Sequence, residues 1–177
     1  LKDDASHLGL TPEEFSRVFT KTPYYGEFNV GRCATHAEDS MAVHNCLGTC
    51  IVYTLLGTDV INIEKLAELY SAVTGIPITA QELKQGGRRN FTLYKLLNIR
   101  EGFNFRDKIS RVWLSPRETP DGPKKLMDYF QKHELTESDV EQLLDDYYEE
   151  RGWNKNGIPT IAKLEDLGLS EFSVNHI

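Results

Sequence analysis

The segment THAEDSMAVHNCLGTCIVYTLLG, residues Thr35–Gly57, decides the fold of this chain. It opens on T-H-A-E, which has the spacing of a helix capping box, and no Asp, Glu, Lys or Arg follows between Ser40 and Thr58. A glycine such as Gly57 is typical of a helix end. Because apolar residues occupy nearly every side of this stretch, we expect a helix from about Thr35 to Leu56, buried on most faces, at the centre of the fold.

The sequence on either side predicts further helices. Thr-Pro-Glu-Glu and Thr-Ala-Gln-Glu capping boxes, an Asn and a Thr at cap positions, and terminal glycines delimit helices at about 11–19, 62–75, 79–98, 140–152 and 160–168. Between Glu101 and Pro123 the helical pattern fails, and prolines mark a long surface crossing. We expect an all-α domain of six or seven irregularly arranged helices over residues 1–177, with a long loop before the C-terminal helices.

Two adjacent glycines, Gly86 and Gly87, lie inside the predicted 79–98 helix. Each costs helix stability of roughly 1 kcal/mol relative to alanine. We therefore expect another backbone or a ligand to pass close to the helix here, or the helix to kink.

Composition excludes several classes of protein. The 177 residues (20.2 kDa) carry 20 basic against 27 acidic side chains, a net charge of −7 with a pI near 5.3. No general basic field exists to attract nucleic acid or an anionic membrane. The long uncharged segment contains His44, Asn45 and several hydroxyls, which favours a buried core helix over a membrane span. We expect a cytoplasmic protein without nucleic-acid or membrane partners.

The three cysteines leave two interpretations open. With His36 they form the series C-x2-H-x9-C-x3-C, from Cys33 through Cys46 to Cys50, whose thiol and imidazole groups could bind zinc. The alternative is that all three thiols are small buried hydrophobes. On a continuous helix, Cys46 and Cys50 would project from the same face.

Gly48 lies between the two later cysteines, inside the predicted helix. A glycine there weakens the helix, and its missing side chain would let a flat group lie against the backbone. Asn45, one turn earlier, can both donate and accept hydrogen bonds, as a heterocycle requires. A helix–helix contact point is the other interpretation.

Other polar groups have simpler interpretations. His44 is read as a satisfied core histidine, and the acidic residues of 145–150 as a solvated helix face. The basic cluster is interpreted as a solvated face with one arginine buried in an ion pair; it comprises Lys84, Arg88, Arg89, Lys95 and Arg100.

Several strings, in order, resemble the C-terminal helical region of the tungsten-containing aldehyde ferredoxin oxidoreductases. N-C-L-G-T-C at Asn45–Cys50 is similar to the family motif D-x-x-G-L-C. L-Y-S-A-V-T-G at Leu69–Gly75 and the G-R-R…N-I-R-E-G-F stretch of 87–103 match two more. D-Y-Y-E-E-R-G-W, N-G-I-P-T and K-L-E-D-L-G-L, within 146–169, match the family's C-terminal signature. The resemblance is strongest over residues 35–170.

The resemblance implies an oxidoreductase that converts aldehydes to carboxylic acids with a tungsten (or molybdenum) bis-pterin centre. A 4Fe–4S cluster would pass the electrons to ferredoxin or a similar carrier. It assigns pterin contacts to Asn45, Gly48 and Thr49 and a cluster ligand to Cys50. Cys46 and Cys33 have no place in the family motif, so we treat both as core thiols. Asn45 replaces the motif's aspartate and Thr49 its leucine, so the pterin contacts differ in detail.

The pterin-binding domain and the other cluster cysteines of the family lie upstream of the matching region. We therefore expect this chain, which opens on Leu1, to be the C-terminal portion of a larger enzyme, with the remainder of its own chain as a partner. The isolated fragment would bind no cofactor and contribute no catalytic residue. The alternatives are a stand-alone helical interaction module and a zinc-stabilised helical domain, both without redox activity.

Overall fold

A computed structural model describes residues 8–20, 28–50 and 62–172 of the chain. Within these ranges the chain forms helices and isolated β-bridges but no strand. The α-helices are α1 (Pro12–Val18), α2 (Val30–Leu47), α4 (Ile63–Thr74), α5 (Ala80–Arg100), α6 (Glu137–Arg151) and α7 (Ile161–Asp166). Short 3-10 turns occupy Arg111–Trp113 and Ser170–Phe172. The all-α prediction is confirmed.

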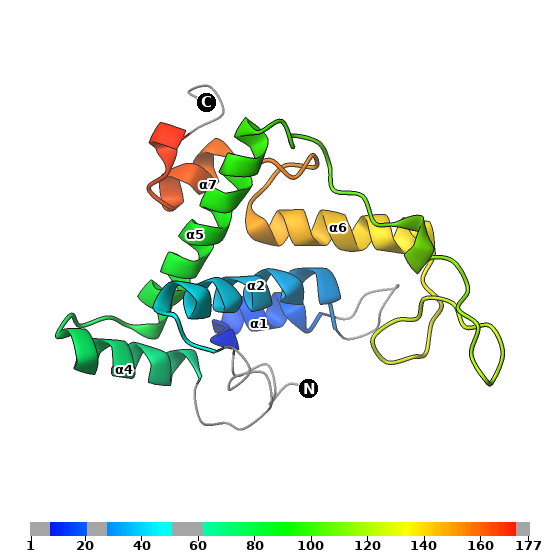
Figure 1. Ribbon diagram of the computed structural model, residues 1–177, viewed down its shortest axis with the longest axis horizontal. Coiled ribbons are helices and arrows are strands. Elements are labelled where there is room, and N and C mark those ends of the chain that lie inside the picture. The colour runs from blue at the N-terminus through cyan, green and yellow to red at the C-terminus, as the bar shows by residue number, and fades with distance from the viewer. Residues whose placement is uncertain (1–7, 21–27, 51–61, 173–177) are drawn as a thin grey trace.

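Helix α2 lies at the centre, as the sequence predicted. It packs against α5, α6 and α1, and α4 packs on the first half of α5 (Figure 1). One apolar cluster joins α2, α4 and α5 through Val43, Ile63, Leu66, Ala67 and Leu83. A second joins α5 to the α7 region through Leu96, Leu164, Leu167 and Leu169.

The predicted caps form at four helix starts. At Thr11 and Thr79 the hydroxyl accepts from the backbone N–H of a glutamate three residues on, and that glutamate's carboxylate accepts from the cap N–H. The side chains of Asn62 and Thr160 accept in the same way from one backbone N–H each. These contacts satisfy amides that have no partner inside the helix.

The predicted bounds of the central helix are wrong at both ends. Helix α2 begins five residues before Thr35, where the Asn29 side chain accepts from the N–H of Arg32. At the other end Gly48 adopts φ +68°, which terminates the helix at Leu47, so the expected continuation does not form. Residues 51–57 of that prediction lie outside the described ranges.

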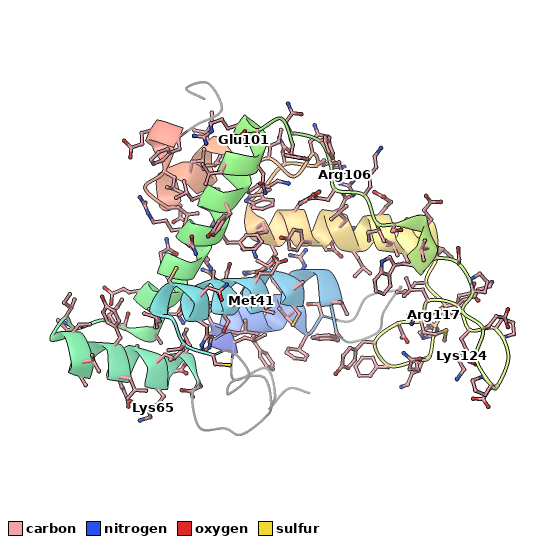
Figure 2. All side chains as sticks on the ribbon, in the orientation of Figure 1. Met41, Lys65, Glu101, Arg106, Arg117 and Lys124 are labelled. Carbon is pink, nitrogen blue, oxygen red and sulfur yellow. The ribbon has the colours of Figure 1, made fainter. Side chains whose placement is uncertain are left out.

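Burial of α2 is also more one-sided than predicted. Its buried residues include Asp39, Val43 and His44, whereas Met41 and Cys46 are exposed. Figure 2 labels Met41 on this helix. An open face therefore runs along α2 to its C-terminal end.

One of the paired glycines does mark a close approach. A Cβ on Gly87 would lie 2.4 Å from the carbonyl oxygen of Asp39 and 2.8 Å from Cγ2 of Val43. A Cβ on Gly86 would meet nothing within 4 Å. The contact between α5 and α2 therefore requires a glycine at position 87 and not at 86.

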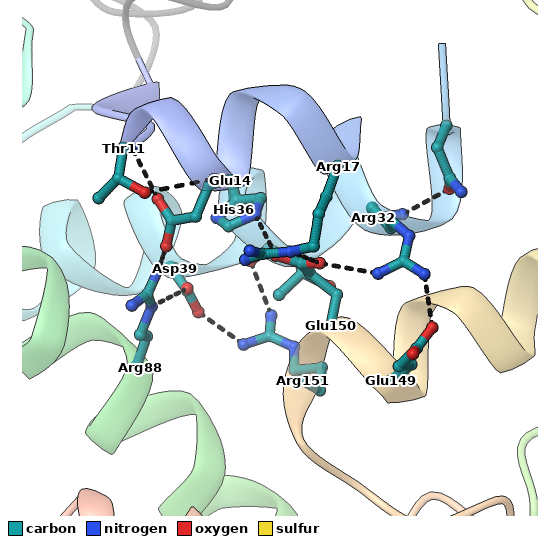
Figure 3. A network of polar contacts seen from close by, with 12 residues as sticks. Thr11, Glu14, Arg17, Arg32, His36, Asp39, Arg88, Glu149, Glu150 and Arg151 are labelled. Carbon is teal, nitrogen blue, oxygen red and sulfur yellow. Dashed lines mark hydrogen bonds and ion pairs between the residues drawn. The ribbon is translucent and has the colours of Figure 1, made fainter. Parts of the chain in front are cut away.

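Charged residues, not only apolar ones, join α1, α2, α5 and α6 (Figure 3). Arg151 donates to Asp39 and Glu38, and Arg88 donates to Asp39 and Glu14. Within the predicted basic cluster, Arg88 forms ion pairs but is only half-buried, and the cation that is buried is Lys84, beside Glu14.

The acidic run of α6 is not the solvated face that we expected. The side chain of Glu150 is almost fully buried, where it accepts from Arg17, Arg32 and His36. Arg32 also pairs with Glu149. The helical spacing of the acids gave no indication of this because their partners come from α1 and α2, more than 110 residues away in sequence.

The long crossing between α5 and α6 is irregular, as predicted. Two antiparallel bridges, Arg117 with Lys124 and Met127 with Glu134, close successive loops within it (Figure 2). Arg106 fastens its first part by donating to the carboxylate of Glu141 and to the backbone carbonyl of Lys155.

Candidate functional site

The C-terminal end of α2 holds the residues that the sequence singled out. Asn45 is in the last turn, Gly48 forms the cap, and Thr49 and Cys50 follow; all four are exposed. Gly48 is therefore a helix terminator, not the mid-helix position that we predicted. Because Cys50 lies beyond the helix end, it does not share a helix face with Cys46, and that prediction is wrong too.

Two backbone hydrogen bonds shape the cap. The Gly48 N–H donates to the carbonyl of Asn45 at 3.3 Å, and the Thr49 N–H donates to that of His44 at 3.0 Å. The last four carbonyls of a helix have no intrahelical partner. Within the described chain, two of them, those of Cys46 and Leu47, remain available to accept from another group.

His44 fixes the turn from the inside. Its Nδ1 lies 2.8 Å from the Thr49 hydroxyl. The ring is almost fully buried, and this burial lowers the pKa of His44, which favours the neutral imidazole. The interpretation of His44 as a core histidine is confirmed, and the ring also positions the residue before Cys50.

Asn45 opens onto a groove of about 590 Å³ between α2, α5 and α6. Its walls are mainly aromatic and amide side chains: Asn45, Phe91, Tyr94, Asn98, Tyr147 and Trp153 are among them. A hollow of this size and composition is typical of a small-molecule or cofactor site.

The sequence analysis missed the contribution of α5 to this site. Asn90 on α5 donates from Nδ2 to Sγ of Cys46 at 3.1 Å. Asn90, Tyr94 and Asn98 follow one another at four-residue spacing on the groove side of α5. That spacing of amide and aromatic residues was visible in the sequence, but the helix was interpreted through its paired glycines and its basic residues instead.

The cysteines do not form a metal site of their own. Among the described residues, no group of three or more His, Cys, Asp or Glu side chains could hold a metal ion, which contradicts the zinc alternative. Cys46 is exposed and Cys33 is half-buried, so the prediction that both are core thiols is wrong for Cys46. Burial raises the pKa of Cys33 to about 11, which makes its thiolate scarce at neutral pH.

Comparison with known proteins identifies the family. Residues 4–169 match the family model described as aldehyde ferredoxin oxidoreductase, domains 2 and 3. The chain belongs to this family. Because the match covers nearly the whole sequence, the resemblance inferred from motifs is confirmed.

This chain covers only part of the length of the named relatives that it matches. It is 28% identical over 137 residues to the tungsten-containing aldehyde ferredoxin oxidoreductase of Pyrococcus furiosus, which covers 76% of this chain and 20% of the relative. The aliphatic sulfonate oxidoreductase, WOR-like subunit, of the same organism is 28% identical over 114 residues, covering 61% and 17%. The chain thus spans about a fifth of the relatives' length.

A solved structure shares the fold. The active site complex BamBC of benzoyl coenzyme A reductase, in complex with 1,5-dienoyl-CoA, aligns with a TM-score of 0.61 at 24% identity. The alignment covers 94% of this chain and 24% of that one. The helical architecture is therefore that of a known fold. No helix within the described ranges has the length and apolarity needed to cross a membrane.

The end of α2 suits one side of the cofactors that this family implies. A pterin carries N–H groups that need acceptors, and the Asn45 amide oxygen and the carbonyls of Cys46 and Leu47 can supply them. A 4Fe–4S cluster takes four thiolates, of which the exposed Cys50 could supply one. The residues present fit a partial site that other residues complete.

Proposed function

We propose that this chain forms one wall of the redox site of an aldehyde-oxidising enzyme that passes electrons to ferredoxin or a similar carrier. The observation that supports the proposal best is the exposure of Asn45, Gly48, Thr49 and Cys50 at one helix end in a member of this family. A tungsten or molybdenum pterin would supply two-electron chemistry, and a 4Fe–4S cluster would carry single electrons onward.

Each residue at the helix end has a separate task in this proposal. Asn45 hydrogen-bonds one edge of the pterin, and the backbone at Gly48 lies open to a ring because even a Cβ there would meet no atom within 4 Å. Thr49, tied to His44, fixes the turn. The Cys50 thiolate is a cluster ligand, and the remainder of the enzyme's own chain supplies the other ligands.

The test compares two cysteines in the full-length enzyme. We expect Cys50→Ala to lower the iron content and to alter or abolish the electron paramagnetic resonance signal of the reduced cluster, while tungsten content stays largely unchanged. Ferredoxin reduction should fall accordingly. We expect Cys46→Ala to be mild, because an exposed thiol with one amide contact contributes within about 0.5 kcal/mol to stability.

The opposite ranking would contradict the assignment: loss of the cluster in Cys46→Ala and its retention in Cys50→Ala. A second readout uses the 177-residue chain alone. Because a single suitable thiolate cannot hold a 4Fe–4S cluster, the chain should stay colourless after anaerobic reconstitution with iron and sulfide. A stable brown species with cluster absorption would show that the chain is not a partial site.

A further inference from the structure

The groove at Asn45 has a size that suits a small ring compound. Its volume of about 590 Å³ lies within the range of small-molecule sites. Its lining residues run from Glu38 to Asn45 on α2 and from Asn90 to Asn98 on α5. Between Asn90 and Asn98 the helix rises roughly 12 Å, which is long enough for an aromatic ring with a short substituent.

Part of the groove wall is an aromatic platform made of Phe91, Tyr147 and Trp153. The guanidinium carbon of Arg151 lies 4.0 Å from the centre of the Phe91 ring and 5.8 Å from that of Trp153. Trp153 also packs at nearly a right angle on Tyr147, with ring centres 6.1 Å apart. These contacts fix the rings before any ligand binds, and a preformed wall loses little entropy on binding.

Two further lining residues are large, apolar and exposed. Tyr94 on α5 is 62% exposed and Met41 on α2 is 45% exposed. Unlike the rings of the platform, the Tyr94 ring packs on no other ring among the described residues. Aromatic rings and thioethers gain energy against a ligand ring beyond the burial of area alone, which an alkyl chain does not provide. The wall therefore favours a flat aromatic ligand.

The charged side chains that line the groove each have a partner of opposite charge. Glu38 accepts from Arg151 at 2.6 Å, and Lys95 lies 3.4 Å from Asp107. A carboxylate or a phosphate-bearing cofactor would find no spare cation on this wall within the described residues. Because an unpaired charge is costly to bury, the ligand should be neutral.

Amide side chains supply the polar contacts of the groove. The side chains of Asn45 and Asn98 have no hydrogen-bond partner within the described part of the chain. The amide N–H groups of either can donate to a carbonyl oxygen. Asn45 lies at the end of α2 that continues into Thr49 and Cys50, so a carbonyl bound there is the one nearest the proposed redox site.

We propose that this groove binds a neutral aromatic carbonyl compound, with its ring between the aromatic platform and Tyr94 and its carbonyl at Asn45. Aromatic aldehydes are then the preferred substrates of the redox site, and Tyr94 is the residue that selects them; this second statement rests on the proposed function. The competing occupant is a segment from the remainder of the enzyme's chain.

A bromine-labelled ketone tests binding without turnover. The probe is 4′-bromoacetophenone, which has an aromatic ring and a carbonyl but no aldehyde hydrogen to lose. Crystals of the full-length enzyme soaked in this ketone should show an anomalous bromine peak in the groove, between the aromatic platform and Tyr94. A groove filled by another segment of the enzyme would leave no room for this peak.

Kinetics of the full-length enzyme test selection. Benzaldehyde and heptanal are neutral aldehydes with the same number of non-hydrogen atoms, and we expect a higher kcat/KM for benzaldehyde. Tyr94→Leu keeps an apolar side chain and removes the ring, so it should lower kcat/KM for benzaldehyde about fivefold and leave that for heptanal nearly unchanged. The control Tyr129→Leu changes a tyrosine that is 56% exposed and does not line the groove, and it should leave the ratio unchanged.

Two results would overturn the proposal. The first is a groove occupied by other protein, or bromine found only elsewhere as an adventitious additive. The second is an equal effect of Tyr94→Leu on both aldehydes. Neither contradicts the proposed function, because an enzyme without aromatic preference can still oxidise aldehydes. Failure to oxidise any aldehyde would contradict the proposed function instead, and the bromine peak would then decide by itself whether the groove binds aromatic carbonyl compounds.

Discussion

At the scale of single residues, Gly48 has a conformational role that does not depend on any ligand. Its φ of +68° ends α2, and the two cap hydrogen bonds that follow turn the chain toward Cys50. A left-handed backbone is costly for any residue with a Cβ except, to a lesser degree, asparagine. The glycine of the family motif can thus be explained by backbone geometry before a pterin is considered.

Substitution at Gly48 should therefore be limited by backbone strain and not by a clash. Gly48→Ala should lower the free energy of unfolding by about 1 kcal/mol, although its Cβ would meet nothing within 4 Å. Gly48→Asn should lose less, because asparagine tolerates the left-handed region. Urea unfolding of the wild type and the two Gly48 variants measures this order of stability. Equal stability of the alanine variant and the wild type would show that position 48 does not keep its positive φ.

Thr49 shows how a departure from the family motif is absorbed locally. The motif has leucine at this position, and here the threonine hydroxyl lies 2.8 Å from the buried His44 ring. A leucine would leave that nitrogen without this partner. The contact between His44 and Thr49 therefore depends on the threonine, and threonine in place of leucine changes how the turn after α2 is stabilised.

At the scale of elements, the crossing of α5 over α2 depends on one of two adjacent glycines. Gly87 lies against the Asp39 carbonyl, and Gly86 is open. We expect Gly87→Ala to lower the free energy of unfolding by about 2 kcal/mol, because backbone cannot yield to a Cβ at 2.4 Å. Gly86→Ala should instead raise it by up to about 1 kcal/mol through helix propensity.

Chemical denaturation of these two variants provides a matched comparison, since they differ by one position on the same helix. A stabilising Gly87→Ala would mean that α5 and α2 are farther apart than described. A destabilising Gly86→Ala would mean that another surface packs against this side of α5.

Four helix starts could be predicted from the sequence because a cap is a local interaction, whereas the start of α2 lies five residues before the predicted cap at Thr35. Thr11 and Thr79 each contact a residue three positions further along the chain, so the sequence motif itself contains both partners of the contact. The end of α2 could not be placed from pattern alone, since the apolar residues that follow Gly48 read as more helix. Only the backbone conformation of the glycine decides between an interior position and a terminus.

The candidate site was predicted unevenly for a related reason. Asn45 was singled out from its hydrogen-bonding capacity beside Gly48, and Cys50 was named as a cluster ligand only through the family resemblance. The spacing of the cysteines with His36 also suggested a zinc site that the described residues do not form. Helix α5 contributes Asn90 and Tyr94 to the wall of the groove because of the way it packs against α2. This packing joins residues that are far apart in the sequence, so local sequence patterns do not indicate it.

At the scale of the whole molecule, ion pairs connect helices that the apolar clusters leave separate. The apolar clusters lie in α2 with α4 and α5, and in α5 with α7. Ion pairs join α6 to α2 through Asp39 and Glu150, and they join α1 to α5 through Glu14 and to α6 through Glu150. Such buried charges are strongly destabilising when one partner is lost, so the domain should be sensitive to protonation of these acids.

Stability should accordingly fall in acid. Burial by itself would raise the pKa of Glu14, but the hydrogen bonds from Lys84 and Thr11 and the charges of Lys84 and Arg88 outweigh it and lower the pKa from 4.5 to about 2. The pKa of Glu150 is lowered as well, by Arg17, His36 and Arg32 against the effect of burial. A carboxylate whose pKa is lowered by folding contributes its full stabilisation at pH values above its pKa in the unfolded chain. This contribution is lost as the pH falls through its pKa in the folded protein.

For Glu14 the window lies between about pH 4.5 and pH 2, and the loss should be about 3 kcal/mol across it. Urea unfolding at pH 7, 4.5 and 3 measures this dependence. Glu14→Gln should be less stable than the wild type at pH 7 by about 3 kcal/mol, because the buried Lys84 loses its partner, and should show a shallower decline in acid. The exposed neighbour is the control, and Glu13→Gln should keep the wild-type pH dependence. If Glu14→Gln declined as steeply as the wild type between pH 4.5 and 3, the acid sensitivity would come from other carboxylates, and Glu14 would not hold α1 to α5 in the way that its contacts with Lys84 and Arg88 indicate.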